Sequence, residues 1–376
     1  MSFLFNIQYP YELIDTKYTL LKLIGRGAFG SVYLAKDNNG VEYILKFINL
    51  KKTTKEDISN EVKALESISS INECKEKGLN RSVLCLVDSF IYKEFFVMVT
   101  NYLENVITLR EYINTFKKLY YLDVHNIQFL MTKLFNQLDI LHNHNIIHGD
   151  IKPENIIVQF NKCNDIKNVM FIDFGNACND KKCLVGGTIH YMAPELLPIL
   201  GSTVLKSQQD FKKTDVWSLG VVFYELLNHA YPFPFESDRI DTRESGLLNP
   251  DNEFVFIKQL NDYYKQQKKI FSHFIPQDEV YNVFNEIVDA MLTIDPLKRK
   301  GIKHFAKRIN IFNLGLLQKT SPRRHCFNSP LVKSAPLEDI FKKYNSNPNL
   351  QNSLSPLSRD NDVFKSTSNL FETKTP

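Results

Sequence analysis

Residues 146–158 read Ile-Ile-His-Gly-Asp-Ile-Lys-Pro-Glu-Asn-Ile-Ile-Val, and two further short motifs follow them along the chain. The first is Ile172-Asp173-Phe174-Gly175 and the second is Ala193-Pro194-Glu195. Any one of these motifs can occur by chance, whereas all three in this order cannot reasonably do so. The ordered set is the most specific signal in the sequence.

A glycine-rich stretch lies nearer the N-terminus, where residues 25–32 read Gly-Arg-Gly-Ala-Phe-Gly-Ser-Val. Because glycine has no side chain, the backbone N–H groups of such a loop can close on phosphate oxygens. A Gly-x-Gly-x-x-Gly sequence also opens Rossmann dinucleotide-binding units, but there a helix follows the glycines directly. Here residues 32–34 continue as a strand, so the pattern favours a phosphate loop between two strands.

Lys46 lies in the otherwise apolar strand pattern of residues 43–48. An unpaired ammonium is costly to bury, so this side chain needs an anion. Two candidates are a bound phosphate and Glu61, which belongs to a predicted helix over residues 55–69 whose apolar face is expected to carry Val62, Leu65 and Ile68. The alternative is that Lys46 extends to solvent along its aliphatic stem.

The periodicity of the sequence predicts a small β-rich lobe followed by a larger α-rich lobe. Strand patterns separated by turn residues cover 18–25, 31–37, 41–48, 82–90 and 94–101. From Thr108 onward the pattern becomes helical, most clearly over 126–143, where leucine recurs every three or four residues.

Length and composition exclude several classes of protein. At 376 residues the chain exceeds the size at which one core divides, and 43% hydrophobic and 23% charged residues are typical of a soluble globular protein. No window is apolar enough to span a membrane, and the N-terminus lacks the basic region of a secretory signal, so a soluble protein of the cytoplasm or nucleus is expected.

The net charge of +4 comes from residues 314–376, whose Ser-, Asn- and Pro-rich composition predicts disorder. No basic stripe with interleaved aromatic residues is present, so nucleic-acid binding is not expected.

The six cysteines, at positions 74, 85, 163, 178, 183 and 326, show no Cys-x-x-Cys pair. Synthesis in the cytosol favours reduced structural thiols. The alternative is that Cys178 and Cys183 form a redox pair within a loop.

With these motifs in their order, the sequence from about Tyr18 to Phe312 resembles the eukaryotic protein kinase family, of the serine/threonine type. The resemblance implies an α+β, bilobal fold with one key helix in the small lobe. It also implies a domain over 18–313, with an N-lobe of about 18–103 and a C-lobe of about 104–313. Residues 1–17 would then be an N-terminal extension and 314–376 a tail.

The resemblance also implies roles for individual residues, with ATP and Mg²⁺ as cofactors. Asp150 would accept the proton of the substrate hydroxyl, Lys152 would stabilise charge on the transferred phosphoryl group, and Asn155 and Asp173 would bind the metal. Thr100 would guard the back of the adenine pocket, and residues 101–103 would form the hinge. The implied ATP-binding residues are Ile24, Gly25, Arg26, Gly27, Ala28, Phe29, Gly30, Ser31, Val32, Ile44, Lys46, Glu61, Thr100, Asn101 and Leu103.

Some positions depart from the family pattern. The residue before the catalytic aspartate, usually an arginine that receives an activation-loop phosphate, is Gly149, and no Ser, Thr or Tyr lies between Gly175 and Thr188. We therefore expect activity that does not depend on activation-loop phosphorylation. Ile44 replaces a smaller alanine, and the segment 196–214 is longer than usual, with no role that the sequence reveals.

Protein substrates with Ser or Thr acceptors are expected from Lys152 and from Thr188 in Gly-Thr-x-x-Tyr-x-Ala-Pro-Glu. Glu154 and Glu225 match positions where kinases that prefer basic substrates place carboxylates. Met192 argues against proline-directed specificity, whereas the Ser-Pro and Thr-Pro sites of the tail indicate an upstream proline-directed kinase as a partner. The alternatives are a pseudokinase scaffold without catalysis, which the complete set of catalytic residues disfavours, and a small-molecule kinase.

Overall fold

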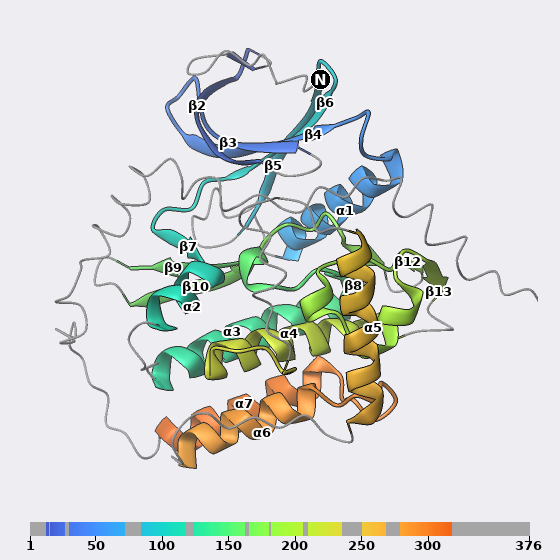
Figure 1. Cartoon of the computed structure of the whole chain (residues 1–376). Helices are drawn as coiled ribbons and strands as arrows, with labels where there is room; N and C mark the ends of the chain where they lie inside the picture. The colour runs from blue at the N-terminus through green and yellow to red at the C-terminus, as the bar shows by residue number, and fades with distance from the viewer. Residues whose placement is uncertain are drawn as a thin grey trace, which may run out of the picture. The chain divides into compact units, whose positions relative to one another are not determined.

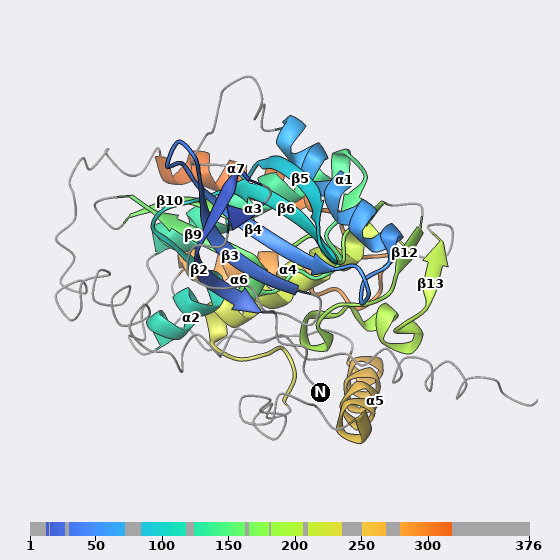
Figure 2. The same ribbon diagram turned by 90° about the horizontal axis from the view of Figure 1, so that it is seen from above.

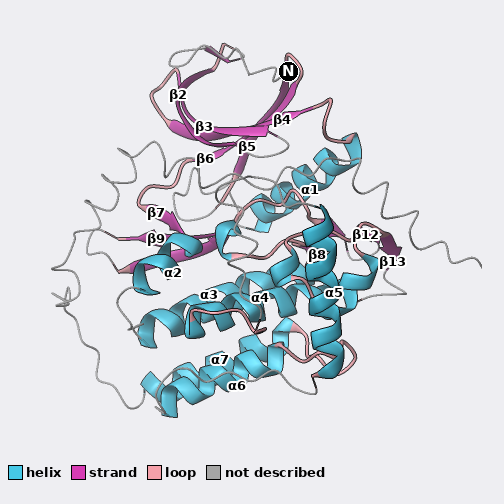
Figure 3. Ribbon diagram, in the orientation of Figure 1, coloured by secondary structure: helices cyan, strands magenta, loops and turns pink. Residues whose placement is uncertain are grey.

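The computed structural model describes residues 13–14, 16–26, 30–71, 84–117, 124–161, 165–179, 182–205, 210–234, 250–267 and 279–317. These residues fall into two compact units, one ending at Glu104 and the other beginning at Asn105. The first unit is mostly strand and the second mostly helix (Figure 3). The expected α+β architecture, with a small β-rich part followed by a larger helical part, is confirmed.

The first unit is built on a six-stranded antiparallel sheet in the order β1-β2-β3-β4-β6-β5 (Figures 1 and 2). Its strands are β1 (Leu13–Ile14), β2 (Tyr18–Arg26), β3 (Gly30–Asp37), β4 (Glu42–Asn49), β5 (Leu86–Tyr92) and β6 (Phe95–Asn101). Four of the five predicted strands are confirmed to within two residues at each end. The fifth is confirmed from Leu86 but is wrong at residues 84 and 85, which precede the strand, and its predicted first residues, 82 and 83, lie outside the described residues.

Side chains alternate between the two faces of this sheet. On β4, Tyr43, Leu45 and Phe47 are buried in a core, whereas Ile44 and Lys46 are only half-buried on the other face. This period of two is what an extended strand imposes on an alternating sequence. One face of the sheet thus packs into the core, and the other face carries Lys46.

The helix α1 (Lys55–Ile71) connects β4 and β5 in sequence. Thr54 precedes it, and its Oγ1 accepts a hydrogen bond of 3.1 Å from the N–H of Asp57, which satisfies one of the free donors of the first turn. The buried face carries Ile58, Glu61 and Leu65. The predicted face of Val62, Leu65 and Ile68 is wrong by a small rotation, because the buried Glu61 pairs with Lys46 and takes a central place on the face.

The second unit contains six helices among its described residues: α2 (Leu109–Lys117), α3 (Val124–Asn143), α4 (Phe211–Asn228), α5 (Pro250–Gln266), α6 (Glu279–Met291) and α7 (Ile302–Leu317). The helix predicted over 126–143 is confirmed as α3. α4 is buried on nearly all sides, and α3 packs against α7 while α4 packs against α6. The rings of Phe135, Phe223 and Phe305 meet at the centre of this helical core.

Two small sheets complete the second unit. One joins β7 (Val106–Thr108), β9 (Ile156–Phe160) and β10 (Ile166–Phe171), and the other has the order β13-β12-β11-β8. The second sheet consists of β8 (Ile146–Ile147), β11 (Cys178–Asn179), β12 (Lys182–Leu184) and β13 (Thr203–Leu205). The strand β13 lies in the segment 196–214, for which the sequence indicated no role.

Some predictions fall wholly or partly outside the described residues. These include the disorder of the tail from residue 318 onward and most of the N-terminal extension. The predicted end of the domain at residue 313 falls within α7, which continues to Leu317, and the domain boundaries stay predictions. Within the described part of the chain, every helix is too short or too polar to cross a bilayer.

A buried ion pair holds the start of the short 3₁₀ segment Pro194–Ile199 in the second unit. Arg299, whose side chain is fully buried, donates hydrogen bonds of 2.6 and 2.9 Å to the carboxylate of Glu195. It also donates to the backbone oxygens of Thr293 and Lys213, and its guanidinium lies 4.9 Å from the ring centre of Trp217. The pair thus joins the segment around Glu195 to the residues that precede α7.

We predict that Arg299→Ala lowers the free energy of unfolding by about 3 to 5 kcal/mol, because it removes the cation of a buried pair. The matched control is Lys298→Ala. Its side chain is 80% exposed, so the loss should stay below about 0.5 kcal/mol. Urea denaturation followed by circular dichroism measures both, and equal losses would contradict the central role of the pair.

Candidate active site

The segment after β8 is anchored on α4 by one buried carboxylate. The backbone N–H of His148 donates to Asp215 Oδ2 at 2.9 Å, and that of Gly149 donates to Asp215 Oδ1 at 3.0 Å. His142 Nε2 lies 2.9 Å from Asp215 Oδ2 as well. The buried charge is therefore satisfied, and the backbone that leads into Asp150 is fixed.

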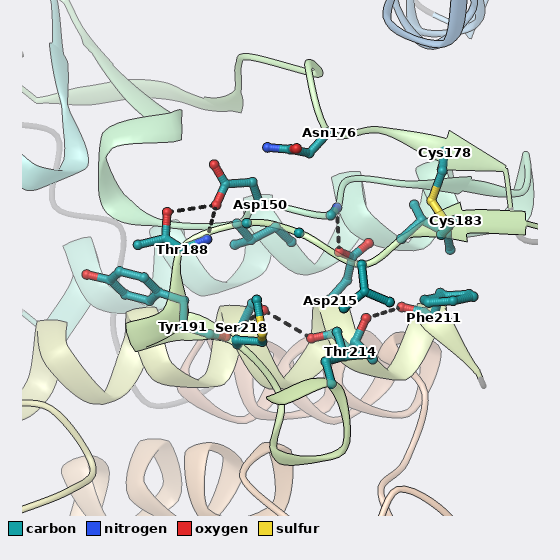
Figure 4. Close-up of a pocket in the computed structure, with 18 of the residues that line it drawn as sticks. Asp150, Asn176, Cys178, Cys183, Thr188, Tyr191, Phe211, Thr214, Asp215 and Ser218 are labelled. Carbon is teal, nitrogen blue, oxygen red and sulfur yellow. Dashed lines mark hydrogen bonds between the residues drawn. A yellow bond between two sulfur atoms is a disulfide. The ribbon is translucent and has the colours of Figure 1, made fainter. Parts of the chain in front are cut away.

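Asp150 is the centre of a hydrogen-bond network in the second unit (Figure 4). Its Oδ1 accepts from the backbone N–H of Thr188 at 2.8 Å and from Thr188 Oγ1 at 2.9 Å. Its Oδ2 accepts from Lys152 Nζ at 2.8 Å, and the same ammonium donates to Thr188 Oγ1 at 2.9 Å. Sequence reasoning used Thr188 as a marker of substrate class and missed it as a site residue.

The ionisation of Asp150 follows from this network. Burial raises the pKa of the Asp150 carboxyl, but the Lys152 ammonium and the hydrogen bonds from Lys152 and Thr188 outweigh burial. Its pKa therefore lies below the usual value of 3.8, and Asp150 is a carboxylate at neutral pH. A carboxylate in this place can accept a hydrogen bond from an incoming hydroxyl and orient it.

Asn155 and Asp173 are brought together by the β9–β10 hairpin. Phe171 pairs with Ile156 in this hairpin, and the N–H of Ile172 donates to the backbone oxygen of Asn155 at 2.9 Å. Asn155 Nδ2 donates to the backbone oxygen of Asp150 at 2.9 Å, which fixes the amide with its donor end toward Asp150. Asp173 is exposed and has φ of +60°. An amide oxygen and a carboxylate are ligands that suit Mg²⁺, so the two side chains fit a metal of this kind.

His148 and Phe174 belong to the packed interior behind these residues. Their ring centres lie 4.9 Å apart, and Phe171 contacts His148 from another side at 5.5 Å. Burial lowers the pKa of His148 despite three nearby aspartates, so its ring is neutral at pH 7. Packing against Phe171 and Phe174 accounts for a buried histidine at this position.

In the first unit, four of the residues predicted to bind ATP lie on the half-buried face of the sheet, whereas Ser31 pairs with Phe47 and lies on the buried face. Lys46 Nζ lies 2.5 Å from Oε1 of the buried Glu61, so the anion predicted for Lys46 is present. Val32 is the β3 partner of Lys46, and Thr100 is the β6 partner of Ile44. Lys46, Val32, Ile44 and Thr100 therefore lie side by side on one surface.

The glycine-rich loop is described only at its two ends, because residues 27–29 lie outside the described residues. An added Cβ at Gly30 would lie 1.7 Å from the backbone oxygen of Phe47, so the close approach of β3 to β4 requires glycine there. An added Cβ at Gly25 would meet no described heavy atom within 4 Å. Packing against the described residues therefore does not explain Gly25. Of the flanking residues, Ile24 and Arg26 are exposed, whereas Ser31 is buried.

The predicted hinge residues are the last residue of β6, Asn101, and the two residues after it. The side chain of Asn101 accepts a hydrogen bond of 2.8 Å from the N–H of Cys85, so it holds the start of β5 in place. Leu103 is buried and Thr100 is half-buried. The backbone role in adenine binding that the family resemblance implies for 101–103 stays a prediction.

Glu154 and Glu225, which the sequence linked to basic substrates, both bind Arg110 of α2. Arg110 Nε donates to Glu154 Oε1 at 2.7 Å, while its Nη1 pairs with Glu225 and its Nη2 donates to the hydroxyl of Tyr191 at 2.5 Å. Burial alone lowers the pKa of Arg110, but Tyr191, Glu225 and Glu154 together raise it. Sequence reasoning missed Arg110, because its partners lie far from it along the chain.

Gly149 has a backbone conformation that side chains rarely adopt. Its φ is +78°, and an added Cβ would lie 2.5 Å from the backbone oxygen of Asn176. The backbone of the segment after Gly175 thus occupies the place where a side chain at position 149 would begin.

The prediction of reduced cysteines is wrong for Cys178 and Cys183, which form a disulfide with a Cα–Cα distance of 5.4 Å. Cys85 is disulfide-bonded as well. The expectation rested on cellular compartment, whereas the antiparallel pairing of β11 with β12 brings Cys178 and Cys183 together.

Comparison with known proteins gives several matches. A family model for the protein kinase domain matches residues 18–309. Calcium-dependent protein kinase 4 of Plasmodium falciparum is 30% identical over 236 residues, which cover 60% of this chain and 40% of that protein. Dual specificity tyrosine-phosphorylation-regulated kinase 3 of Homo sapiens is 29% identical over 235 residues, covering 62% and 37%. Probable serine/threonine-protein kinase yakA of Dictyostelium discoideum is 32% identical over 227 residues, covering 59% and 14%. The matches thus span less than half the length of these relatives.

An aromatic cluster next to Tyr191 contains a histidine whose pKa is strongly shifted. The ring of His190 lies 4.8 Å from that of Phe256, 5.1 Å from that of Tyr231 and 6.2 Å from that of Phe233. Burial lowers the pKa of His190 from 6.5 to about 4, with Glu154 acting against this shift and Arg110 adding to it. His190 is therefore neutral in the folded protein at pH 7.

Because the pKa of His190 is lower in the folded than in the unfolded chain, its contribution to stability is complete above pH 6.5 and is lost as the pH falls toward 4. We predict that between pH 7 and pH 5 the wild type loses about 2 kcal/mol more unfolding free energy than His190→Phe does. Tyr231→Phe, in the same cluster, is the control and should keep the wild-type pH dependence. Identical pH profiles for wild type and His190→Phe would contradict the prediction.

Proposed function

Since the chain belongs to the protein kinase family, we propose that it transfers the γ-phosphoryl group of ATP, with Mg²⁺ as the metal, to serine and threonine hydroxyls of protein substrates. The observation that carries this proposal is the network of Asp150, Lys152 and Thr188. Each of its members has a partner at 2.8–2.9 Å, so the network is preorganised for a substrate hydroxyl.

In this proposal Asp150 orients the acceptor hydroxyl and takes its proton. The carboxylate is ionised at neutral pH because of Lys152 and Thr188. Lys152, held between Asp150 and Thr188, is placed to stabilise negative charge on the transferred group. The two residues would thus act on the acceptor and on the phosphoryl group respectively.

The proposed metal ligands are Asn155 and Asp173, whose oxygen atoms suit Mg²⁺. When bound, the metal would neutralise charge on the phosphates of the nucleotide. The chain's own contribution is to hold the two ligands, through the β9–β10 hairpin and through the bond from Asn155 Nδ2 to Asp150.

For ATP we propose the residues of the half-buried sheet face in the first unit together with the glycine-rich loop and residues 101–103. Lys46, positioned by Glu61, would bind phosphate oxygens. Gly25 would allow close approach of the backbone to the phosphates, which agrees with the space around it among the described residues.

The assignment of serine and threonine as acceptors rests on Lys152 and Thr188. Their contact at 2.9 Å joins the catalytic loop, residues 148–155, to the segment before Ala193. Two of the matched relatives carry names of serine/threonine or calcium-dependent protein kinases, and the third is named a dual specificity kinase. An upstream proline-directed kinase that modifies the tail remains a proposal based on sequence.

We further propose that activity does not require phosphorylation of the segment between Gly175 and Thr188. This segment contains no Ser, Thr or Tyr. Gly149 offers no side chain to bind a phosphate, and its conformation together with Asn176 leaves no room for one to begin there.

We predict that Lys46→Met and Asp173→Asn each reduce phosphoryl transfer to a peptide library roughly a hundredfold or more, because one removes a phosphate ligand and the other a metal ligand. Folding should persist in both, as judged by circular dichroism. The matched controls are the exposed Lys36→Met on β3 and the partly exposed Asp139→Asn on α3, which should retain wild-type turnover. Undiminished transfer by Asp173→Asn would contradict its role as a metal ligand, and no transfer by the wild type would favour the scaffold alternative.

A second prediction concerns phosphorylation. Protein made in bacteria should keep its kcat/KM after exhaustive phosphatase treatment, because the segment 176–187 has no Ser, Thr or Tyr hydroxyl to phosphorylate. Mass spectrometry verifies the removal of phosphate, and heat-inactivated phosphatase serves as the control. A large loss of activity that incubation with ATP restores would refute the proposal.

A further inference from the structure

The disulfide between Cys178 and Cys183 closes the hairpin of β11 and β12. The two residues are five positions apart, and the adjacent pair Asn179 and Lys182 are partners in the strand register. The hairpin lies between Gly175 and Thr188, in the segment that contains no Ser, Thr or Tyr. The disulfide is thus a covalent restraint within this segment.

One strand of the hairpin is attached to the catalytic loop. Cys178 on β11 pairs with Ile147 on β8, and Ile147 directly precedes His148, whose N–H is bound to Asp215. β11 is therefore fixed relative to Asp150 through β8 and α4. The sulfur of Cys178 sits close to this fixed point.

The other strand is attached to the segment 196–214. Cys183 on β12 pairs with Val204 on β13, and Figure 2 shows the two strands side by side. Beyond the strand pairing, the N–H of Val185 donates to Ser202 O at 2.8 Å and the N–H of Gly201 donates to Val185 O at 2.8 Å. The longer segment thus has a structural role, which is to extend the hairpin by one strand.

From Cys183 the chain runs directly into the network of Asp150. Val185 is buried, and Gly187 has φ of +107° with its Cα so close to the catalytic loop that an added Cβ would lie 2.7 Å from Gly149 O. Thr188 follows and binds Asp150 through both its N–H and its hydroxyl. The position of Thr188 therefore depends on the residues that β12 leads into.

Cys178, Cys183 and Asp150 line one pocket of the second unit (Figure 4). Cys183 is 3% exposed, whereas Cys178 is half-buried, so Cys178 Sγ is the more accessible of the two sulfur atoms. An incoming thiolate is therefore expected to attack Cys178, with Cys183 as the leaving thiolate.

We propose that Cys178 and Cys183 form a reversible thiol–disulfide switch that orders residues 182–188 and so sets the rate of phosphoryl transfer. This inference rests on the proposed function. In the oxidised state the covalent bond joins β12 to the strand fixed beside Asp150. In the reduced state only the strand pairing of these short strands holds the hairpin, and more conformations are open to it.

Glutathione is the proposed exchange partner. A glutathione thiolate bonds to Cys178 Sγ, the Cys178–Cys183 bond breaks, and Cys183 leaves as a thiolate that takes up a proton. A second glutathione thiolate then attacks the glutathione sulfur of this mixed disulfide and releases Cys178. In sum, two glutathione molecules become one glutathione disulfide and the protein gains two thiols.

The experiment equilibrates the 376-residue chain at a series of ratios of glutathione to glutathione disulfide. The kcat/KM for a peptide substrate is measured at each ratio, and mass spectrometry reports the state of Cys178 and Cys183. We expect kcat/KM to fall roughly tenfold as the disulfide is reduced. Hydrogen exchange of residues 182–188 should accelerate over the same range of ratios.

Two variants separate this switch from other thiols. Cys178→Ser/Cys183→Ser should show the low kcat/KM at every ratio, together with fast exchange of residues 182–188. Cys326→Ser, which removes a cysteine of the tail, should respond to the ratio as the wild type does. A response that persists in the double variant would assign the effect to another cysteine and overturn the proposal.

Two further outcomes distinguish this inference from the proposed function. Equal kcat/KM and equal exchange in both redox states of the wild type would overturn the switch and leave the kinase activity standing. Absence of transfer at every ratio would refute the proposed function and the effect on rate, while hydrogen exchange would still decide whether the disulfide orders residues 182–188.

Discussion

The carboxylate of Asp215, buried on α4, accepts hydrogen bonds from two consecutive backbone N–H groups, those of His148 and Gly149. A carboxylate buried at this depth is costly unless donors surround it, and a backbone bound at two adjacent positions cannot rotate independently of α4. One interaction thus joins the most buried helix of the second unit to the residue that precedes Asp150. The geometry of Asp150 therefore depends on α4 as well as on the contacts of its own loop.

The rest of the site is built outward from this anchor by short-range contacts. Asp150 holds Thr188 and Lys152 directly, and Asn155 is tied back to Asp150 through its amide group. The β9–β10 hairpin then places Ile172, and hence Asp173, next to Asn155. Each of these second-unit side chains is therefore at most a few contacts from α4, and a change that loosens Asp215 should disturb all of them together.

Sequence reasoning could predict the parts that repeat or that lie close together along the chain. Alternating apolar residues predicted β4 because an extended strand has a period of two, and the motif 146–158 predicted Asp150, Lys152 and Asn155. Contacts between distant residues could not be read in this way, which is why Arg110 with its two glutamates was missed. The predicted buried face of α1 was rotated from the observed one because only apolar residues were used to define it. The charged Glu61 is also buried, through its pairing with Lys46.

The cysteine pair shows how an inference from composition fails against local geometry. Compartment and spacing favoured free thiols, yet a hairpin with Asn179 opposite Lys182 brings the residues that flank this pair together, whatever the compartment. The chain that leads into this hairpin passes next to Gly149, where Asn176 occupies the space of a side chain. This chain has Gly149 where the family resemblance implies an arginine, and it has no Ser, Thr or Tyr between Gly175 and Thr188. The segment between these two residues therefore needs other contacts to hold it in place. Among the described residues, β11 pairs with β8, β12 pairs with β13, and the disulfide joins β11 to β12. Under our proposal, strand pairing and this covalent bond supply the order that a bound phosphate would otherwise give.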